Sequence, residues 1–496
     1  MKSANVWLQG IGLAGLDTDL ALNGLTQDSR EIMAGDAFVA MAAGKGVQND
    51  HIHEAIARGA SLIVRDDLDE RIAVSVPVIY VPDLRTRLSA MAAAYYDLPG
   101  QSLQVMAVTG TNGKTSTAHW MAQSWHALNL SSGMLGTLGN GLWGNGLWGN
   151  GLKGHIQRST HTTLEPIRLQ RTLRELVDQG MTHLAMEASS HGLAQFRMEA
   201  VPVHWAVFTN LSRDHLDYHG SMDAYAAAKA RLFLWPTLKG VVLNADDAFT
   251  NTLRQNLQSD IHCLTFGSTD SADLCCLHVQ SATSGLVLQV RSPWGSAELQ
   301  TQVFGLYNVG NLLAVLGVLL VQGVAWEQAV GLLTQLQPVR GRMQVLRIHG
   351  KPKVVVDYAH TPDALQKLLA DVRSWCTGRI RLVFGCGGDR DPGKRPLMGS
   401  IATQFADEVW LTSDNPRTED PLHIIAMIEA GCDRVVQVQP DRYAAIREAI
   451  FSAASEDVVV VAGKGHEDYQ EVMGKRHPFD DVRVAGTLLE ANHETE

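Results

Sequence analysis

The stretch LQVMAVTGTNGKTSTAHWMAQSWHALN, residues 103–129, decides the fold of the chain around it. Its apolar beginning, Leu103–Val108, predicts a buried β-strand, and the residues from Lys114 to about Asn129 predict a helix. Between strand and helix lies a glycine-containing turn, Gly110-Thr111-Asn112-Gly113-Lys114-Thr115-Ser116. A strand that turns through glycines into a helix is typical of an α/β fold with a phosphate-binding loop. An ordinary strand–helix turn is the alternative.

Each residue type in this loop has a use in binding a nucleoside triphosphate. Glycines let backbone N–H groups close around phosphate, and the N-terminus of the helix favours anions. Lys114 can neutralise the outer phosphates, and the Thr115 hydroxyl can hold Mg²⁺. The spacing departs from the full P-loop pattern, because Val108 stands in place of its first glycine.

Further buried strands are predicted at His183–Met186, Ala206–Thr209 and Val241–Asn244, and helices between them imply a mostly parallel sheet. Glu187 directly follows the first of these strands, and Asp214-His215-Leu216-Asp217 follows the second. The carboxyl ends of parallel strands meet at one edge of a sheet, so we expect these side chains near Thr115. Together they predict a magnesium site, although each residue alone is more often a cap, a turn residue or a surface group.

The rest of the chain divides into two more α/β segments. Short strands and helices precede Leu98-Pro99-Gly100, which marks a boundary. Residues 262–304 predict added antiparallel strands, and Asn308–Val321 predicts a long helix. A second doubly wound pattern begins near Gln337-Pro338, with strands at 353–356, 381–384, 408–411 and 457–461. We therefore predict three domains, covering residues 1–98, 99–338 and 339–496.

A short tandem repeat interrupts the central segment. Gly139-Asn140-Gly141-Leu142-Trp143 recurs as 144–148 and partly as 149–153. A period so short and so rich in glycine and asparagine cannot build a core, so we expect a flexible surface loop.

Two basic elements in the third segment follow predicted strands: Gly385–Arg390 and Asp414-Asn415-Pro416-Arg417. The first resembles a dinucleotide loop only weakly, because Arg390 stands where the third glycine belongs. The two arginines could clamp a carboxylate, or they could form surface salt bridges. Gly463-Lys464-Gly465-His466-Glu467 is predicted to lie at the same sheet edge.

The composition excludes several classes of protein. Of the 496 residues, 45% are hydrophobic and 19% are charged, which excludes a disordered or fibrous chain. The formal net charge of −11 argues against binding to nucleic acid or to anionic membranes. The six cysteines form no CxxC pair, so we expect neither a zinc site nor disulfides, and no membrane-spanning segment is apparent. We expect a cytoplasmic protein.

Taken together, the motifs resemble those of the Mur ligases, which are ATP-dependent amide ligases of peptidoglycan precursor synthesis, and most closely those that add 2,6-diaminopimelate. The resemblance covers all three segments. It rests on GTNGKTS (110–116), AMEASSHGL (185–193), TNLSRDHLDYHG (209–220), YNVGNLLA (307–314), GRM (341–343), VVVDYAHTPDAL (354–365), FGCGGDRD (384–391), SDNPRTE (413–419) and GKGHEDYQ (463–470).

The resemblance implies roles for individual residues. Gly110–Ser116 would hold the ATP phosphates, with Thr115 and Glu187 on one Mg²⁺ and His215 on a second. Lys229 matches the lysine that the family carries as a CO₂-derived carbamate, an anion that can ligate Mg²⁺. Further nucleotide contacts fall to Asn308, Arg342, Asp357 and His360. The contacts to a UDP-muramoyl dipeptide fall to Asp28, Ser29, Thr162, Thr163, Ser189, Gln195 and Arg197.

The resemblance also implies a pocket for meso-diaminopimelate, made of Arg390, Asp414, Asn415, Pro416, Arg417, Gly463 and Glu467. Arg417 would pair with the distal carboxylate, which L-lysine lacks, so we expect diaminopimelate to be the substrate. Three features depart from the family pattern: Gln27, where an apolar residue is common, Gly44-Lys45-Gly46, and His161, where asparagine is common.

The implied reaction proceeds through an acyl phosphate of the D-glutamyl carboxylate, which the amino acid attacks to give the amide, ADP and phosphate. Its partners would be these small molecules, and we expect a monomer. Two rival hypotheses remain. A folylpolyglutamate synthase shares the phosphate loop but has no use for the N-terminal segment or for DNPR, and a nucleotide-dependent switch leaves the arginines of the third segment unexplained.

Overall fold

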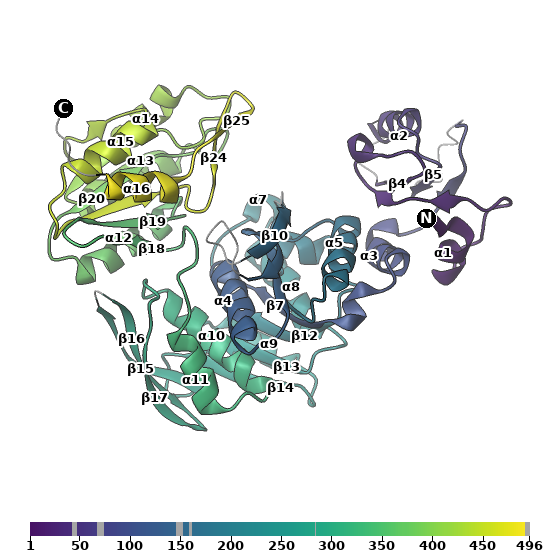
Figure 1. Ribbon diagram of the computed structural model, residues 1–496, viewed down its shortest axis with the longest axis horizontal. Helices are drawn as coiled ribbons and strands as arrows, with labels where there is room; N and C mark the ends of the chain where they lie inside the picture. The colour runs from purple at the N-terminus through teal and green to yellow at the C-terminus, as the bar shows by residue number, and fades with distance from the viewer. Residues whose placement is uncertain (42–46, 67–73, 145–151, 158–160, 283, 492–496) are drawn as a thin grey trace. The chain divides into compact units, whose positions relative to one another are not determined.

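The computed structural model describes residues 1–41, 47–66, 74–144, 152–157, 161–282 and 284–491. The chain divides into two compact units, Met1–Thr265 and Phe266–Glu496 (Figure 1). Both units are mixed α/β structures with parallel sheets, as the sequence predicts. The division into three domains stays a prediction.

The first unit begins with a small parallel sheet in the order β3-β4-β5-β6. Side chains alternate along its strands, so Val39 and Val64 pack with α1 and α3, while Phe38 and Ile63 pack on the other face with α2. The elements of this part are β1 Lys2–Ser3, α1 Ala4–Gly10, β2 Ala21–Leu22, β3 Leu25–Thr26, η1 Ser29–Glu31, β4 Ala37–Ala40, α2 Val47–Ala57, β5 Leu62–Arg65, β6 Val78–Tyr80, α3 Leu84–Tyr95 and η2 Pro99–Ser102.

The larger sheet of the first unit has β7 at its centre, with the parallel strands β11 and β12 on either side. The order of its strands is β10-β9-β8-β11-β7-β12-β13. The elements are β7 Gln104–Thr109, α4 Lys114–Ala127, β8 Ser132–Gly136, β9 Gly139–Trp143, β10 Leu152–Gln157, α5 Pro166–Asp178, β11 His183–Glu187, α6 Ser190–Ala194, β12 Val203–Phe208, α7 Leu216–His219, α8 Met222–Ala230, η3 Arg231–Leu234, β13 Gly240–Asn244 and α9 Phe249–Gln255, with β14 His262–Gly267 at the boundary of the units.

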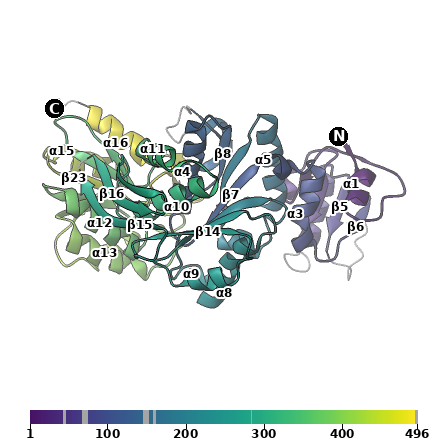
Figure 2. The same cartoon turned by 90° about the horizontal axis from the view of Figure 1, so that it is seen from below.

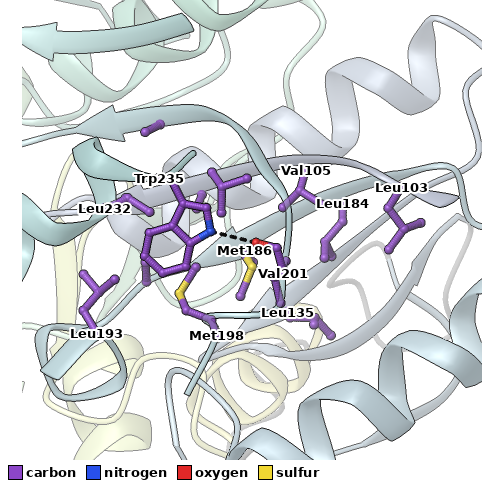
Figure 3. Packing of buried hydrophobic residues seen from close by; sticks show 14 of the residues in the cluster. Leu103, Val105, Leu135, Leu184, Met186, Leu193, Met198, Val201, Leu232 and Trp235 are labelled. Carbon is purple, nitrogen blue, oxygen red and sulfur yellow. Dashed lines mark hydrogen bonds between the residues drawn. The ribbon is translucent and has the colours of Figure 1, made fainter. Parts of the chain in front are cut away.

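One face of this sheet carries a hydrophobic core (Figure 3). Val105 and Leu184 come from neighbouring strands, and Leu193 and Met198 come from the segment after β11. The Trp235 indole N–H donates to the Val201 carbonyl at 2.8 Å, which satisfies its one polar group inside the core. Helix α3 lies beside α5 in Figures 1 and 2, so the small sheet packs against the larger one through these helices.

The first copy of the tandem repeat corrects the prediction of a flexible loop. Residues Gly139–Trp143 form β9, which pairs antiparallel with β8. Glycine permits the close approach, since a Cβ atom on Gly133 would lie 2.7 Å from the Gly141 carbonyl oxygen. Most of the remaining repeat, residues 145–151, lies outside the described residues, as does Gly44-Lys45-Gly46.

The second unit contains an antiparallel arrangement of β15, β16 and β17, as predicted for residues 262–304, although β14 and β15 are parallel. A six-stranded sheet of this unit has the order β18-β19-β23-β20-β21-β22, and β24 pairs with β25 in a separate antiparallel sheet. The elements are β15 Leu274–Ala282, β16 Gly285–Ser292, β17 Gly295–Gln300, α10 Asn308–Val321, α11 Trp326–Thr334, β18 Gln344–Leu346, β19 Lys353–Asp357, α12 Pro362–Trp375, β20 Ile380–Phe384, α13 Lys394–Phe405, β21 Glu408–Leu411, α14 Pro421–Glu429, β22 Gln437–Val438, α15 Arg442–Phe451, β23 Val458–Ala462, β24 Tyr469–Val472, β25 Lys475–Pro478 and α16 Asp481–Glu490.

Helices cover both faces of this second sheet. Val355, Leu382 and Val460 pack with α12, α13 and α14, whereas Val459 and Val461 pack on the opposite face with α15 and α16. Strands β19, β20, β21 and β23 run parallel, so their carboxyl ends share one edge, where the loops of the candidate site begin.

Candidate active site

The turn between β7 and α4 brings its backbone close to the neighbouring strand. Gly110 has a φ angle of +153°, and a Cβ atom there would lie 1.9 Å from the Thr209 hydroxyl oxygen. Gly113, with φ +87°, is the N-cap of α4 and makes no side-chain hydrogen bond, so no side chain of the cap residue covers the N-terminus of the helix. Lys114 Nζ donates to the carbonyls of Gly110 and Thr111 at 2.8 and 2.9 Å. The loop has the backbone that phosphate binding requires.

The other residues of the loop brace it against the segment that follows β12. The Thr111 hydroxyl donates to the Ser212 carbonyl at 3.1 Å, and the Asn112 N–H donates to the Asn210 side chain at 3.0 Å. Ser116, in the first turn of α4, is buried.

Thr115 and Glu187 meet, as the sequence predicts. The Thr115 hydroxyl donates to Glu187 Oε2 at 3.0 Å, and the Thr137 N–H donates to Oε1 of the same carboxylate at 2.7 Å. Gly136 leaves the room for this carboxylate, because a Cβ atom there would lie 2.3 Å from Oε1. A hydroxyl and a carboxylate are the oxygen donors that Mg²⁺ prefers, so this pair fits the predicted ion. Among the described residues, no group of three or more His, Cys, Asp or Glu side chains is arranged to hold a metal.

Lys229 lies deep beside the phosphate loop, with 1% of its surface exposed. Its Nζ donates to the Gly110 carbonyl at 2.8 Å and lies 4.4 Å from the centre of the Tyr225 ring. Burial, together with the nearby charge of Lys114, lowers the pKa of this amine to about 6. A buried amine that is largely uncharged at neutral pH can react with CO₂, so the site suits a carbamate.

His215 lies near the same tyrosine. Its ring centre is 6.0 Å from that of Tyr225 and 4.9 Å from that of His191, and its Nε2 lies 3.6 Å from Asp214 Oδ2. His215 is the N-cap residue of α7 and has a φ angle of +53°. About half of its side chain is exposed. Tyr225 therefore links His215 and Lys229, two of the predicted metal ligands.

Four of the residues predicted to bind the dipeptide part of a substrate form one network. The Ser189 and Thr163 hydroxyls lie 3.0 Å apart, and Arg197 donates to the Thr163 carbonyl at 2.7 Å and to Gln195 Oε1 at 2.7 Å. Arg197 also pairs with Glu165 at 2.9 Å. Burial lowers the pKa of its guanidinium from the usual value, while the neighbouring Glu165 opposes this shift.

A cavity of about 230 Å³ adjoins this network in the first unit. Gln195 and Arg197 line it from one side, and Gln27, Met41 and Arg85 line it from the N-terminal part of the chain. A second cavity of about 180 Å³ lies beyond Gln27, among Phe38, Ala40, Met41, Gln48 and His51. The two cavities share Gln27 and Met41 in their linings.

The remaining residues predicted at this substrate have local contacts. Asp28 pairs with Arg30 at 2.7 Å, which holds the pKa of the carboxyl below its usual value, and the Ser29 hydroxyl donates to Glu54. Thr162 accepts a hydrogen bond from Thr137 at 3.4 Å. His161 is exposed, and partial desolvation of its ring lowers its pKa.

The predicted nucleotide contacts Asn308, Arg342, Asp357 and His360 all lie in the second unit. The buried Asp357 carboxylate accepts hydrogen bonds from the Tyr307 hydroxyl at 3.1 Å and from the Met343 N–H at 2.6 Å. Since Asn308 follows Tyr307 and Arg342 precedes Met343, these two bonds bring three of the four residues together. Burial raises the pKa of Asp357.

Arg342 and the fourth residue of the set, His360, both contact Tyr358. The Arg342 guanidinium lies 4.5 Å from the centre of the Tyr358 ring, and His360 Nδ1 lies 2.8 Å from the Tyr358 carbonyl oxygen. Asn308 donates to the Phe304 carbonyl at 2.7 Å, which fixes its side chain.

Three loops at the carboxyl edge of the second sheet bring together the residues predicted to bind the amino acid. Gly388 N–H donates to the Asn415 carbonyl at 2.9 Å, and a Cβ atom on Gly463 would lie 2.5 Å from Asp414 Oδ2. Asn415 Nδ2 donates to Glu467 Oε2 at 2.8 Å. These contacts join all three loops, and both Asp414 and Asn415 are buried.

The two arginines of this region differ in their surroundings. Arg417 Nη1 donates to the Gly388 carbonyl at 2.6 Å, its Nε lies 3.7 Å from Glu471 Oε2, and its backbone has a φ angle of +50°. Arg390 is exposed. Pro416 has its carbonyl against Gly388, where a Cβ atom would lie 2.0 Å from it.

Sequence reasoning missed several residues of these sites. Tyr225 lies four residues before Lys229 on α8, and this helical spacing could have indicated their contact. Arg395 makes two hydrogen bonds to Glu419, at 2.8 and 2.9 Å, and so braces the loop of Arg417; no local pattern indicates this.

The doubly wound sheets and the loop before α4 define a nucleotide-binding protein of the α/β class. Residues 108–319 match the Mur ligase middle domain, and residues 341–465 match the Mur ligase, glutamate ligase domain. The chain belongs to the Mur ligase family.

Full-length relatives and solved structures agree with this membership. UDP-N-acetylmuramoyl-L-alanyl-D-glutamate–2,6-diaminopimelate ligase from Chromobacterium violaceum is 44% identical over 480 residues, which cover 95% of each chain. The ligase of the same name from Pseudomonas aeruginosa is 45% identical and covers 96% of each chain. A solved structure with this name is 36% identical with a TM-score of 0.70, covering 98% of this chain and 99% of that one. Folylpolyglutamate synthase from Mycobacterium tuberculosis, 18% identical with a TM-score of 0.61 over 76% of this chain and 92% of that one, shares only the fold.

Proposed function

We propose that this chain is an ATP-dependent ligase that joins meso-2,6-diaminopimelate to UDP-N-acetylmuramoyl-L-alanyl-D-glutamate. Relatives with that name match it at 44 and 45% identity over nearly their whole length, and this observation carries the proposal. The phosphate loop, the cavity beside Arg197 and the three loops around Asn415 each offer a place for one of the three substrates.

The proposed reaction has two steps. An oxygen of the D-glutamyl carboxylate attacks the γ-phosphorus of ATP, and ADP leaves. The amino nitrogen at the L-centre of diaminopimelate then attacks the acyl carbon, loses a proton, and displaces phosphate. Lys114 and the N-terminus of α4 hold the phosphates and offset the charge that gathers on the phosphoryl oxygens.

Thr115 and Glu187 would hold one Mg²⁺, and His215 would contribute to a second. The bound ions would neutralise phosphate charge during transfer. Lys229 would take part as a carbamate, formed when its uncharged amine adds CO₂ and releases one proton. Its burial and its lowered pKa support this modification, because only the uncharged amine reacts with CO₂. A cationic lysine at this position would repel Mg²⁺.

Arg417 would recognise the distal carboxylate of diaminopimelate. L-lysine lacks this group and would leave the guanidinium without a substrate carboxylate, a loss of about 2–5 kcal/mol where such a charge pair is buried. The positive φ angle of Arg417 and its bond to the Gly388 carbonyl hold the side chain in one orientation.

No helix within the described parts of the chain has the length and apolar character needed to cross a membrane. We place the reaction in the cytoplasm and expect a monomer. Sedimentation at several protein concentrations tests the monomer, because a rising sedimentation coefficient would contradict it.

Phosphate release tests the function directly. ATP, Mg²⁺ and UDP-muramoyl-L-Ala-D-Glu are supplied with either meso-diaminopimelate or L-lysine at equal concentration, and the products are identified by mass spectrometry. We expect release and a tripeptide product with diaminopimelate. A preference for lysine would keep the ligase but remove the role of Arg417, and release independent of any amino acid would contradict the proposed function.

A further inference from the structure

Lys464 is a lysine whose side chain has no exposed surface at the edge of the second sheet. It follows β23 in the turn Gly463-Lys464-Gly465, and both glycines have positive φ angles, +110° and +53°. A Cβ atom on Gly465 would lie 2.6 Å from the Gly341 carbonyl oxygen. The backbone around Lys464 is therefore tightly fixed, and its ammonium group has a defined position.

The ammonium group contacts two residues of the amino-acid site at once. Lys464 Nζ donates to Asn415 Oδ1 at 3.0 Å and to Glu467 Oε2 at 3.1 Å. The Asn415 amide in turn donates to the same Glu467 oxygen at 2.8 Å. Lysine, amide and carboxylate therefore close a three-membered hydrogen-bonded ring across two loops that are far apart in the sequence.

This ring decides which way the Asn415 amide faces. Its oxygen accepts from Lys464 and also from the Glu471 N–H at 2.9 Å, so its nitrogen must point to Glu467. The Glu467 carboxylate is fixed in the same way, because two donors hold Oε2. Within the described residues, Oε1 accepts no hydrogen bond, and the Glu467 side chain keeps 18% of its surface exposed. Glu467 Oε2 is thus held by two hydrogen bonds, while Oε1 is available to a ligand.

The burial of a cation does not by itself show that the residue stabilises the fold, because apolar side chains of similar size often give equal stability in place of a buried ion pair. This unit has a separate buried ion pair for its packing: Arg442 and Asp481 meet at 2.7 Å with no exposed surface. The hydrogen bonds from Lys464 Nζ to Asn415 and to Glu467, by contrast, both go to residues of the candidate site.

We propose that Lys464 is a positioning residue that holds Asn415 and Glu467 in the geometry that receives the amino acid. The inference rests on the proposed function, because it concerns the binding of the amino-acid substrate. It assigns no direct contact between Lys464 and that substrate. Glu467, presented through Oε1, would receive an ammonium group of the amino acid, and Lys464 would act only through its two neighbours.

The test is Lys464→Met, which keeps the length of the side chain and removes its charge and donors. We expect the KM for diaminopimelate to rise at least about tenfold, while the KM values for ATP and for the UDP-linked substrate stay within about twofold. Unchanged KM for diaminopimelate in the folded variant would overturn the proposal.

A matched control lies at the opposite end of the same strands. Arg381 is a buried cation that pairs with Asp457 at 3.1 Å, where β20 and β23 begin. Arg381→Met should lower the melting temperature and leave the KM for diaminopimelate unchanged. An equal rise of that KM in both variants would show a general loss of packing and would count against positioning by Lys464.

A double-mutant comparison adds a readout that a purely structural role would not give. If Lys464 acts through Glu467, the loss in Lys464→Met/Glu467→Gln is smaller than the product of the two single losses. A loss in the double variant equal to the product of the two single losses would contradict the proposal. If Lys464→Met does not fold, Lys464→Gln keeps a polar group beside Asn415 and is expected to show the same selective rise. If wild-type phosphate release does not depend on diaminopimelate, the proposed function fails, whatever the variants do.

Discussion

Lys229 combines burial, a lowered pKa and a bond to the phosphate loop in one side chain. Lys229→Ala should lower kcat at least about a hundredfold, because it removes the group that would carry the carbamate. Added acetate or formate should restore part of the activity, since a small carboxylate can occupy the space. The control is Lys239→Ala, which removes an exposed lysine. Normal activity of Lys229→Ala without any addition would contradict the carbamate.

Arg417 carries the choice between diaminopimelate and lysine. Arg417→Ala should reduce kcat/KM for diaminopimelate at least about thirtyfold, the lower end of the loss expected for a buried charge pair, and should change the KM for ATP little. Arg373→Ala serves as the control, because Arg373 pairs with Asp407 on the surface, with about two fifths of each side chain exposed. If Arg417→Ala impaired the use of ATP as strongly as the use of diaminopimelate, the loss would come from disturbed folding and not from lost recognition of the amino acid.

Lys114 tests the phosphate loop itself. Its ammonium group lies over the carbonyls of Gly110 and Thr111, where the outer phosphates of ATP are expected. Lys114→Ala should abolish phosphate release while the melting temperature stays near that of the wild type, because the side chain is only partly buried. Full activity in this variant would remove the assigned role of the loop.

Helix α4 contains a histidine whose burial makes the first unit sensitive to acid. His119 is 2% exposed, and burial lowers its pKa to about 3. The unfolded chain binds a proton there below about pH 6.5, whereas the folded chain does not, so stability falls as the pH falls through this window. Between pH 6.5 and pH 5 the loss is about 2 kcal/mol.

Urea unfolding at pH 7.5 and pH 5 measures this loss. His119→Leu should lose about 2 kcal/mol less than the wild type between the two pH values, while His349→Leu, which replaces an exposed histidine, should behave as the wild type does. Identical pH dependence in His119→Leu and the wild type would contradict the assignment.

Elements with a strong local pattern could be predicted from the sequence, and elements made by pairing could not. Helix α10 has the predicted bounds, Asn308–Val321, because an uninterrupted apolar run can be satisfied only inside a core. Strand β9 was predicted wrongly as a loop, because a glycine-rich repeat shows no alternation and becomes a strand only through its pairing with β8. Likewise, Thr115 belongs to a recognisable string, whereas the burial of Lys464 depends on Asn415, 49 residues away.

For the whole molecule, we predict which of the two compact units binds each ligand. The cavities beside Gln27 and the Arg197 network lie in Met1–Thr265, whereas the three loops around Asn415 lie in Phe266–Glu496. In hydrogen exchange of the full chain, the UDP-linked dipeptide should slow exchange near residues 195–197, and diaminopimelate should slow it near 414–417 and 463–471. Bound ligand slows exchange because it stabilises the closed state of the residues that it contacts.

L-lysine at the same concentration is the control for this experiment, because it lacks the carboxylate assigned to Arg417. It should leave exchange at 414–417 unchanged. If diaminopimelate instead slowed exchange only in the first unit, the amino-acid site would have been placed on the wrong unit, and the roles of both Arg417 and Lys464 would fall with it. Protection by lysine equal to that by diaminopimelate would keep the site and remove only its selectivity.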